Sequence, residues 1–294
     1  MNTNLHRDLS KRIGQMIAKA KTKIINRIKK ISRSFGVELS KFDEFNRWQT
    51  LSEFLIIHIE RTNLGSTTKD DDEFIKYIIK NYQKSRSQLF QDLLVLCLFK
   101  DKQNGFFVEF GATNGVSFSN SYLLEKEFKW KGILAEPGKT WHTELVANRG
   151  CRIDLRCVWD ISKEKISFNE TLCAELSTVE EYTDVDQLAK ARVNNKSYSV
   201  ETVSLNDLLE QNDSPSVIDF MSIDTEGTEF KILNQFNFEK YNVRVICVEH
   251  NFTEPVRKNI YELLLRNSFE RVFTEYSNFD DWYVSRNLSD MTAL

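Results

Sequence analysis

The chain has 294 residues, which is long enough to bury a full hydrophobic core and favours one large domain with a smaller appendage. Hydrophobic residues make up 41% and charged residues 28% of the sequence, as in soluble globular proteins, and no segment reaches the length of a membrane span. The net charge of −3 is unevenly distributed, because residues 1–35 carry ten Lys or Arg against one acid, a balance of +9 that leaves −12 for the rest. An acidic body argues against general nucleic-acid binding.

An apolar stripe with spacings of three and four residues runs through the N-terminal arm and predicts a long amphipathic helix. Its members are Leu5, Leu9, Ile13, Ile17, Ala20, Ile24, Ile28 and Ile31. Two interpretations stay open: the helix packs on its own protein or a second copy, or it lies on an anionic membrane or polymer surface. The second would make the protein peripherally membrane-bound through residues 1–35.

Further helices are predicted over residues 43–60, from residue 70 and over 87–99, and the polar segment 62–72 is the best linker candidate. A helical N-terminal extension, residues 1–80, is therefore predicted to precede a second domain, residues 81–294. The five cysteines show neither CxxC nor zinc-finger spacing, and the N-terminus lacks the apolar segment of a signal peptide. These features predict reduced thiols in a cytoplasmic protein.

From residue 105 onward, apolar strands alternate with helices. Strands are predicted at 106–110, 132–136, 151–158, 217–223, 243–249, 269–274 and 281–285, and helices at 119–128, 139–148, 204–211, 227–235 and 255–267. Near-continuous apolar strands that alternate with helices predict an α/β fold, with a parallel sheet covered on both faces. Residues 165–203 break the alternation and are predicted to form extra strands or a loop insertion beside the site.

Polar residues, most of them acids, follow nearly every predicted strand of this domain. In an open α/β sheet, ligands bind beyond the carboxyl ends of the strands, near the point where the strand order reverses. Purely structural loops would not need an acid at so many strand ends, so the set indicates a binding site. The segments concerned are 109–115, Glu136, 154–158, 224–227 and 249–251.

The loop after the first strand, FVEFGATNG, indicates the kind of cofactor. A dinucleotide site prefers GxGxxG, whereas this loop has a Gly-x-x-x-Gly spacing with Glu109 two residues before Gly111. A carboxylate there is unfavourable beside a pyrophosphate but suits the ammonium and sulfonium groups of S-adenosylmethionine. After the next strand, Glu136 would accept the ribose hydroxyls. A nicotinamide-dependent oxidoreductase and a non-catalytic binding module on the same fold remain as alternatives.

Seven segments of the chain together resemble FkbM-type methyltransferases, in the order in which that family has them. They are SQLFQDLLVLCLF, FVEFGATNG, SFSNSYLLE, WKGILAEP, ETVSLNDLL, VIDFMSIDTEGTEFKIL and VRVICVEHN. The resemblance extends from about residue 83 to residue 285 and leaves residues 1–80 outside. It implies a Rossmann-like, seven-stranded class I methyltransferase sheet, S-adenosylmethionine as methyl donor, and O-methylation of a hydroxyl on a saccharide or related small molecule.

The resemblance also implies roles for individual residues. Gly111, Asn114 and Gly115 would line the methionine end of the cofactor, although the family usually has Asp where Asn114 stands. The turn that contains Asp154 and Cys157 would lie at the adenine. Asn120 would contact the cofactor or cap the following helix, two interpretations that stay open.

Methyl transfer to a neutral hydroxyl needs a base or a metal ion. His250 is one candidate base because its unperturbed pKa is near neutrality, and Asp224 and Glu226 are the others. Asp224, Glu226 and Glu249 could instead bind a hard divalent cation such as Mg²⁺. Alternatively, Asp224 and Glu226 only cap the helix that begins near residue 227.

Overall fold

The computed structural model describes residues 39–171, 174–182 and 195–288. Its chain divides into two compact units, Met1–Phe45 and Asn46–Leu294, and the fold given below is that of the second. The predicted amphipathic helix and its interpretations lie outside the described residues. Among the helices that are described, none is long and apolar enough to cross a membrane.

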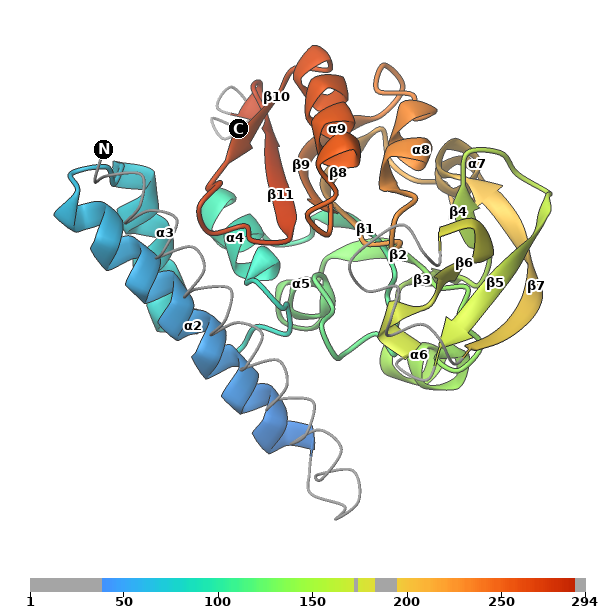
Figure 1. The fold of residues 1–294 in the computed structure, drawn as a ribbon, viewed down its shortest axis with the longest axis horizontal. Coiled ribbons are helices and arrows are strands. Elements are labelled where there is room, and N and C mark those ends of the chain that lie inside the picture. Colours follow the sequence, from blue (N-terminus) through green and yellow to red (C-terminus); the bar gives the residue numbers. More distant parts are fainter. Residues whose placement is uncertain (1–38, 172–173, 183–194, 289–294) are drawn as a thin grey trace, which may run out of the picture. The chain divides into compact units, whose positions relative to one another are not determined.

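A seven-stranded sheet forms the centre of the second unit (Figure 1). Its strand order is β10-β11-β9-β8-β1-β2-β3, and β11 alone runs antiparallel to its neighbours. The strands are β1 (Phe106–Phe110), β2 (Lys131–Ala135), β3 (Arg152–Asp154), β8 (Val217–Ile223), β9 (Asn242–Glu249), β10 (Phe269–Val272) and β11 (Asp280–Ser285). The predicted α/β fold with a largely parallel sheet is confirmed.

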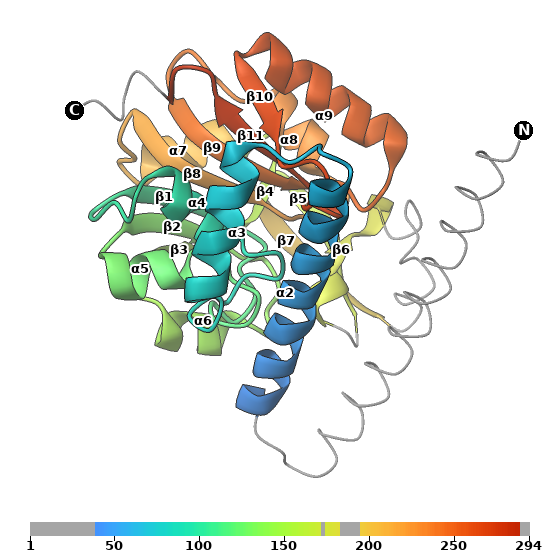
Figure 2. The same cartoon turned by 90° about the vertical axis from the view of Figure 1, so that its left-hand side faces the viewer.

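Helices cover both faces of this sheet, because successive residues of its strands point to opposite sides. Phe107 faces one core, which includes buried residues of α2 (Leu39–Asn63), α3 (Lys69–Asn81), α4 (Gln91–Leu98), α5 (Tyr122–Phe128) and α6 (His142–Asn148). Val108 faces the other core, with α7 (Leu205–Gln211), α8 (Glu229–Asn234) and α9 (Glu254–Arg266). Figure 2 shows these two sets of helices on either side of the strands.

Local sequence signals explain several helix ends. Thr68 and Asp71 form a capping box at the start of α3, in which each side chain accepts from the other residue's backbone N–H. The Ser204 side chain accepts from the N–H of Asp207 and caps α7 in the same way. The predicted helix from residue 119 begins only at Tyr122, because Ser119, Asn120 and Ser121 bind the carboxylate of Glu109 instead.

The single strand predicted over residues 151–158 is wrong, because it divides between two sheets. β3 ends at Asp154, whose carboxylate accepts from the backbone and side chain of Arg156 and turns the chain away. β4 (Cys157–Trp159) then pairs with β7 (Asn195–Ser204) in a second sheet. Leu155, between the two strands, is 41% exposed, so the chain passes along the surface where one continuous strand was predicted.

The second sheet confirms the extra strands predicted within residues 165–203. It contains β4, β7, β5 (Lys165–Thr171) and β6 (Thr178–Val179), with the short helices η1 (Ala174–Leu176) and η2 (Glu180–Tyr182) beside them. The hydroxyl of Thr178 donates to the backbone carbonyl of Glu226 at 3.0 Å. The insertion therefore lies against the turn that follows β8.

Candidate functional site

The sheet order reverses at β1, which lies between β2 and β8. The loops after these strands meet at the carboxyl edge of the sheet. Gly111 has φ +74°, and a Cβ there would lie 2.1 Å from the carbonyl oxygen of Asp224, so only glycine fits. On the other side, the N–H of Thr113 donates to Glu136 at 2.8 Å. The structure therefore brings together three of the five segments that the sequence indicated as a site, those after β1, β2 and β8.

Glu136 is buried at the end of β2, where its carboxylate accepts from the backbone N–H groups of Thr113 and Gly138, at 2.8 and 2.7 Å. An ionised carboxylate has about four lone-pair sites, so two more hydrogen bonds remain possible. Burial raises the pKa of Glu136 to about 7, and the charges of Asp224 and Glu170 add to the rise. The carboxylate therefore keeps acceptor capacity, and its contact with the ribose hydroxyls stays a prediction.

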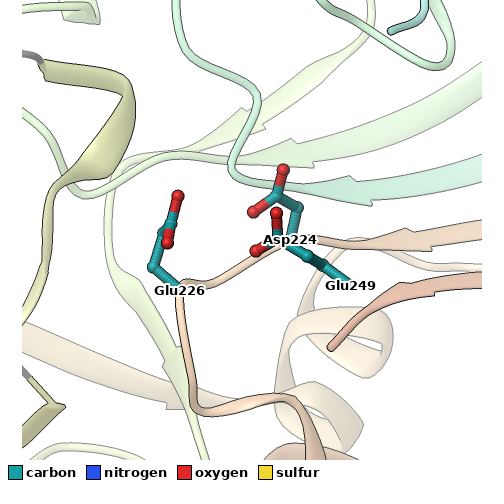
Figure 3. A group of neighbouring side chains, drawn as sticks. All are labelled: Asp224, Glu226 and Glu249. Carbon is teal, nitrogen blue, oxygen red and sulfur yellow. The ribbon is translucent and has the colours of Figure 1, made fainter. Parts of the chain in front are cut away.

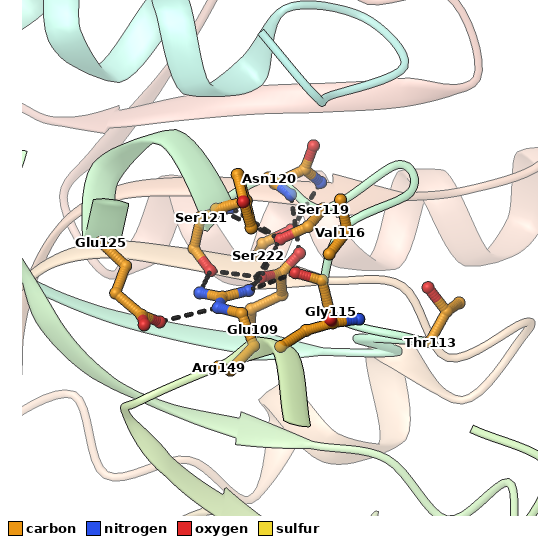
Figure 4. Close-up of polar contacts among 12 residues, drawn as sticks. Glu109, Thr113, Gly115, Val116, Ser119, Asn120, Ser121, Glu125, Arg149 and Ser222 are labelled. Atoms are coloured by element: carbon orange, nitrogen blue, oxygen red, sulfur yellow. Dashed lines mark hydrogen bonds and ion pairs between the residues drawn. The ribbon is translucent and has the colours of Figure 1, made fainter. Parts of the chain in front are cut away.

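Glu109 is held differently, by protein groups on all sides (Figure 4). The carboxylate is 3% exposed and accepts from Ser119 Oγ at 3.0 Å, from the N–H of Asn120 at 2.7 Å and from Ser121 Oγ. The guanidinium of Arg149 lies 3.8 Å away. These contacts use the lone pairs that a direct contact with the cofactor would need, and such a contact stays a prediction.

The two asparagines of the following loop have different surroundings. Asn114 Oδ1 accepts from the N–H groups of Val116 and Ser117, at 3.0 and 2.9 Å, which makes it a turn former. Asn120 is buried, and its amide donates to Ser222 Oγ of β8 at 2.9 Å. Asn120 therefore connects the loop to the neighbouring strand, while the cofactor contacts predicted for both asparagines remain untested.

The residues predicted at the adenine lie where the chain leaves the main sheet. The carboxylate of Asp154 accepts hydrogen bonds from the backbone N–H and the guanidinium of Arg156, at 2.6 to 3.0 Å. Cys157 is a free cysteine in the small core of the second sheet, and burial raises the pKa of its thiol to about 12. Both side chains point to structural roles, and their contact with the cofactor stays a prediction.

Three carboxylates gather beyond β8 and β9 (Figure 3). Asp224, Glu226 and Glu249 each offer an oxygen, and these oxygens lie within 4.8 Å of one another. Burial raises the pKa of Asp224 to about 7 and that of Glu249 well above its usual value, and the negative charges of neighbouring acids add to both shifts. Asp224 and Glu249 also share a hydrogen bond. This hydrogen bond requires a proton on one of the two carboxyl groups.

Asn251, which lies in the predicted segment 249–251 but was given no role of its own, connects two of these acids. Its amide nitrogen lies 2.8 Å from Glu249 Oε2 and 3.2 Å from Glu226 Oε2. Its place two residues after a strand-end acid was the only signal available. A further missed residue is Glu229, which accepts from the N–H groups of Thr225 and Gly227 and so stabilises the turn.

His250 is buried with both ring nitrogens facing the protein. Nδ1 accepts from the N–H of Phe252 at 3.0 Å, and Nε2 lies 3.8 Å from Asp281 Oδ1. Burial lowers the pKa of the imidazole, although Asp281 opposes the shift. Because Nδ1 already accepts from Phe252, a neutral ring carries its proton on Nε2 and has no free lone pair, which favours a carboxylate over His250 as base.

A pocket of about 100 Å³ lies beside Glu249, one of the three carboxylates. Apolar and polar groups share its wall: Tyr182 comes from the insertion, Glu249 ends β9, and Asn251 follows that strand. The complete lining is Tyr182, Gly227, Glu229, Glu249, His250, Asn251, Thr253 and Val256. Gly227 has φ +118°, and a Cβ there would lie 3.1 Å from Tyr182, so the turn and the insertion fit closely.

Fold and site together define an α/β protein with a candidate ligand site at the reversal of its sheet. The profile of the FkbM methyltransferase domain matches residues 109–281, more than half of the chain. The chain belongs to this family, as the motifs predicted, and family membership supports methyl transfer with S-adenosylmethionine as the donor.

A search of solved structures finds precorrin-6y C5,15-methyltransferase from Geobacter metallireducens GS-15 among its matches. The two chains are 12% identical with a TM-score of 0.33, and the match covers 61% of this chain and 71% of the other. Similarity at this level carries no argument about substrate. No curated protein matches the chain.

The residues of the site fit a cationic nucleoside. Burial and the negative charges of neighbouring acids raise the pKa values of Glu136, Asp224 and Glu249, so an unbalanced negative charge is unfavourable there. A bound sulfonium and ammonium would stabilise the ionised carboxylates. Glu136 also keeps free lone pairs for ribose hydroxyls.

The buried carboxyl groups allow a prediction of how the stability of the fold depends on pH. Burial raises the pKa of Asp280 to about 8, against an opposing hydrogen bond from Gln91. The folded state therefore keeps a proton that the unfolded chain releases above about pH 4, so stability falls between about pH 4 and pH 8 and levels off above that range. We expect the unfolding midpoint in calorimetry to drop by roughly 3–6 °C between pH 6 and pH 9. In Asp280→Asn the drop should be smaller, whereas an equal drop would exclude Asp280 as a cause.

Proposed function

We propose that the protein transfers a methyl group from S-adenosylmethionine to a hydroxyl of a saccharide or related small molecule. We also propose that its sheet is the class I methyltransferase arrangement. One observation carries the proposal: Asp224 is half-buried, has a pKa of about 7 and hydrogen-bonds to Glu249 on the wall of a pocket. A carboxylate with this pKa is suited to take the proton of a hydroxyl group near pH 7.

The donor would bind at the loops after β1 and β2. Glu136 would accept the two ribose hydroxyls, and the bend at Gly111 would place the loop backbone along the methionine end. The bound donor supplies an electrophilic methyl carbon. The protein would align this carbon with the acceptor oxygen, an arrangement that can account for much of the rate acceleration.

The acceptor would bind in the pocket beyond β8 and β9. Adjacent hydroxyls of a sugar can donate to neighbouring carboxylate oxygens, and Glu226 and Glu249 are held side by side by Asn251. Tyr182 and Val256 offer apolar surface for the C–H face of the ring. As the methyl group is transferred, the hydroxyl proton would pass to Asp224.

Two experiments test this function. Calorimetry with S-adenosylmethionine and with NAD should give binding of the first alone, whereas binding of NAD alone would favour the oxidoreductase alternative. Incubation with a labelled methyl donor and a host extract should then label a saccharide-bearing product on oxygen. Donor binding without any labelled product would favour the non-catalytic module.

We expect Mg²⁺ to be dispensable. Asn251 directs one N–H group to Glu226 and another to Glu249, which occupies lone pairs that a cation would use, and Asp224 shares a proton with Glu249. Label transfer should stay within about twofold in the presence of EDTA, since no step requires a Lewis acid. A large loss that Mg²⁺ restores would instead support the metal site at Asp224, Glu226 and Glu249.

For residues 1–35 we propose peripheral docking on an anionic surface in the cytoplasm, supported by their balance of +9. The full chain should sediment with vesicles that contain anionic lipid, and sedimentation should weaken with salt. A chain without residues 1–35 should stay in the supernatant. Equal sedimentation of both chains would contradict the docking role.

A further inference from the structure

We propose that Arg149 is a positioning residue that holds the loop after β1 in its cofactor-binding shape, and that Glu109 acts through this arginine and the loop rather than by touching the cofactor. The inference rests on the proposed function for the identity of the cofactor. It concerns how the protein prepares the methionine end of that site.

Arg149 directly follows α6. Its side chain is fully buried beneath the loop after β1, which lies more than 27 residues earlier in the chain (Figure 4). Its guanidinium donates to the carbonyl of Gly115 at 3.1 Å, to Ser119 Oγ at 3.0 Å and to Ser121 Oγ at 2.8 Å. On its outer side it donates to Glu125 of α5 at 2.7 Å. One side chain therefore connects the glycine bend with the start of the next helix.

Glu109 completes this network from the sheet. The two serines that contact Arg149 also donate to Glu109, and the N–H of Asn120 binds the second carboxylate oxygen. The positive charge that balances the buried Glu109 carboxylate is therefore Arg149 of the protein itself, 3.8 Å away. A group whose lone pairs are used in this way can shape the loop but is poorly placed to bind a ligand directly.

The second glycine of the motif has a role in the same network. Gly115 has φ +77°, and a Cβ there would lie 2.6 Å from Cγ of Arg149 and 2.8 Å from Cδ1 of Leu145. The absent side chain therefore makes room for the arginine, not only for a ligand. Glu109, Gly115 and Arg149 depend on one another, although the sequence places Arg149 34 residues after Gly115.

The test compares two ligands that differ at the methionine end. S-adenosylhomocysteine carries the amino-acid group, and 5′-methylthioadenosine lacks it but keeps the ribose and adenine. In calorimetry, Arg149→Lys and Glu109→Gln should each weaken S-adenosylhomocysteine about tenfold, because the loop is misplaced, and leave methylthioadenosine within about twofold. Arg244→Lys, at the buried pair of Arg244 with Asp219 outside the loop, should leave the ratio of the two affinities unchanged.

Three results would overturn the inference. Equal weakening of both ligands would show that Arg149 only stabilises the fold, and a loss confined to Glu109→Gln would show direct contact by Glu109. If the unaltered chain binds neither ligand, the proposed function fails and the inference fails with it. Should Arg149→Lys not fold, as judged by its circular dichroism, Ser121→Ala removes a single arm of the network and should shift the same ratio in the same direction.

Discussion

Glu136→Gln is expected to weaken the binding of S-adenosylmethionine by about 10- to 100-fold, which corresponds to about 1.4–2.8 kcal/mol. The carboxylate already accepts from Thr113 and Gly138, and in the complex it would also accept from two ribose hydroxyls. An amide keeps one acceptor oxygen and turns the other into a donor. It therefore loses one ribose contact and faces one backbone N–H with its own N–H₂ group.

Calorimetry at pH 8 measures this loss, with Glu170→Gln as the matched control. Glu170 contributes to the raised pKa of Glu136 but binds Tyr198 and the N–H of Thr140. If Glu136 contacts the ribose, the control should bind the donor within about threefold of the unaltered protein, since an indirect charge effect is screened. Equal losses in both variants would contradict direct contact and indicate a general electrostatic effect.

Asp224→Asn should reduce kcat by about 10²- to 10⁴-fold while the donor still binds within about threefold, because a base acts in the chemical step. The amide retains the size of the carboxyl group but cannot accept the proton. Turnover of the unaltered enzyme should rise with pH and level off above about 7, the value for Asp224. This apparent value belongs to Asp224 and Glu249 together, since the two groups share a proton.

Rates with the acceptor found by label transfer, measured between pH 5 and pH 9, test this role. In Asp224→Asn, the acidic limb of the profile, which is the rise of the rate with pH below about 7, should disappear together with most of the activity. His250→Gln serves as the comparison, because its ring nitrogens face Phe252 and Asp281. The His250→Gln substitution should lower the stability of the protein but leave the acidic limb of the pH profile in place. A flat profile in His250→Gln, with Asp224→Asn active, would return the role of base to His250.

The sequence predicted the parts of the site that depend on strand ends. Glu136 and Asp224 follow apolar strands, and a parallel sheet places all such ends at one edge, so their meeting follows from the order of the elements. Gly111 was predicted to line the methionine end of the cofactor, and this contact stays a prediction. The structure gives a separate reason for glycine here, because φ is +74° and the backbone lies close to Asp224 of the protein itself.

Other features could not be predicted because they depend on which distant groups meet. Glu109 ends its strand like the other acids, but three groups of the next helix start and Arg149 satisfy it. His250 has a suitable ordinary pKa, yet burial lowers it and the protein surrounds both nitrogens. A side chain's type gives its possible chemistry, whereas burial and partners determine which part of it is used.

Hydrophobic periodicity and motif order are local properties of the chain, so they were enough to predict the class of the fold, the family and the sheet edge that carries the candidate site. The packed structure was needed to show that Asp154 ends β3 and sends the chain into a second sheet, that Asn251 bridges two acids, and that Arg149 lies beneath the glycine bend. Each of these depends on contacts between residues whose spacing carries no periodic signal, and on burial that exists only once the layers have packed.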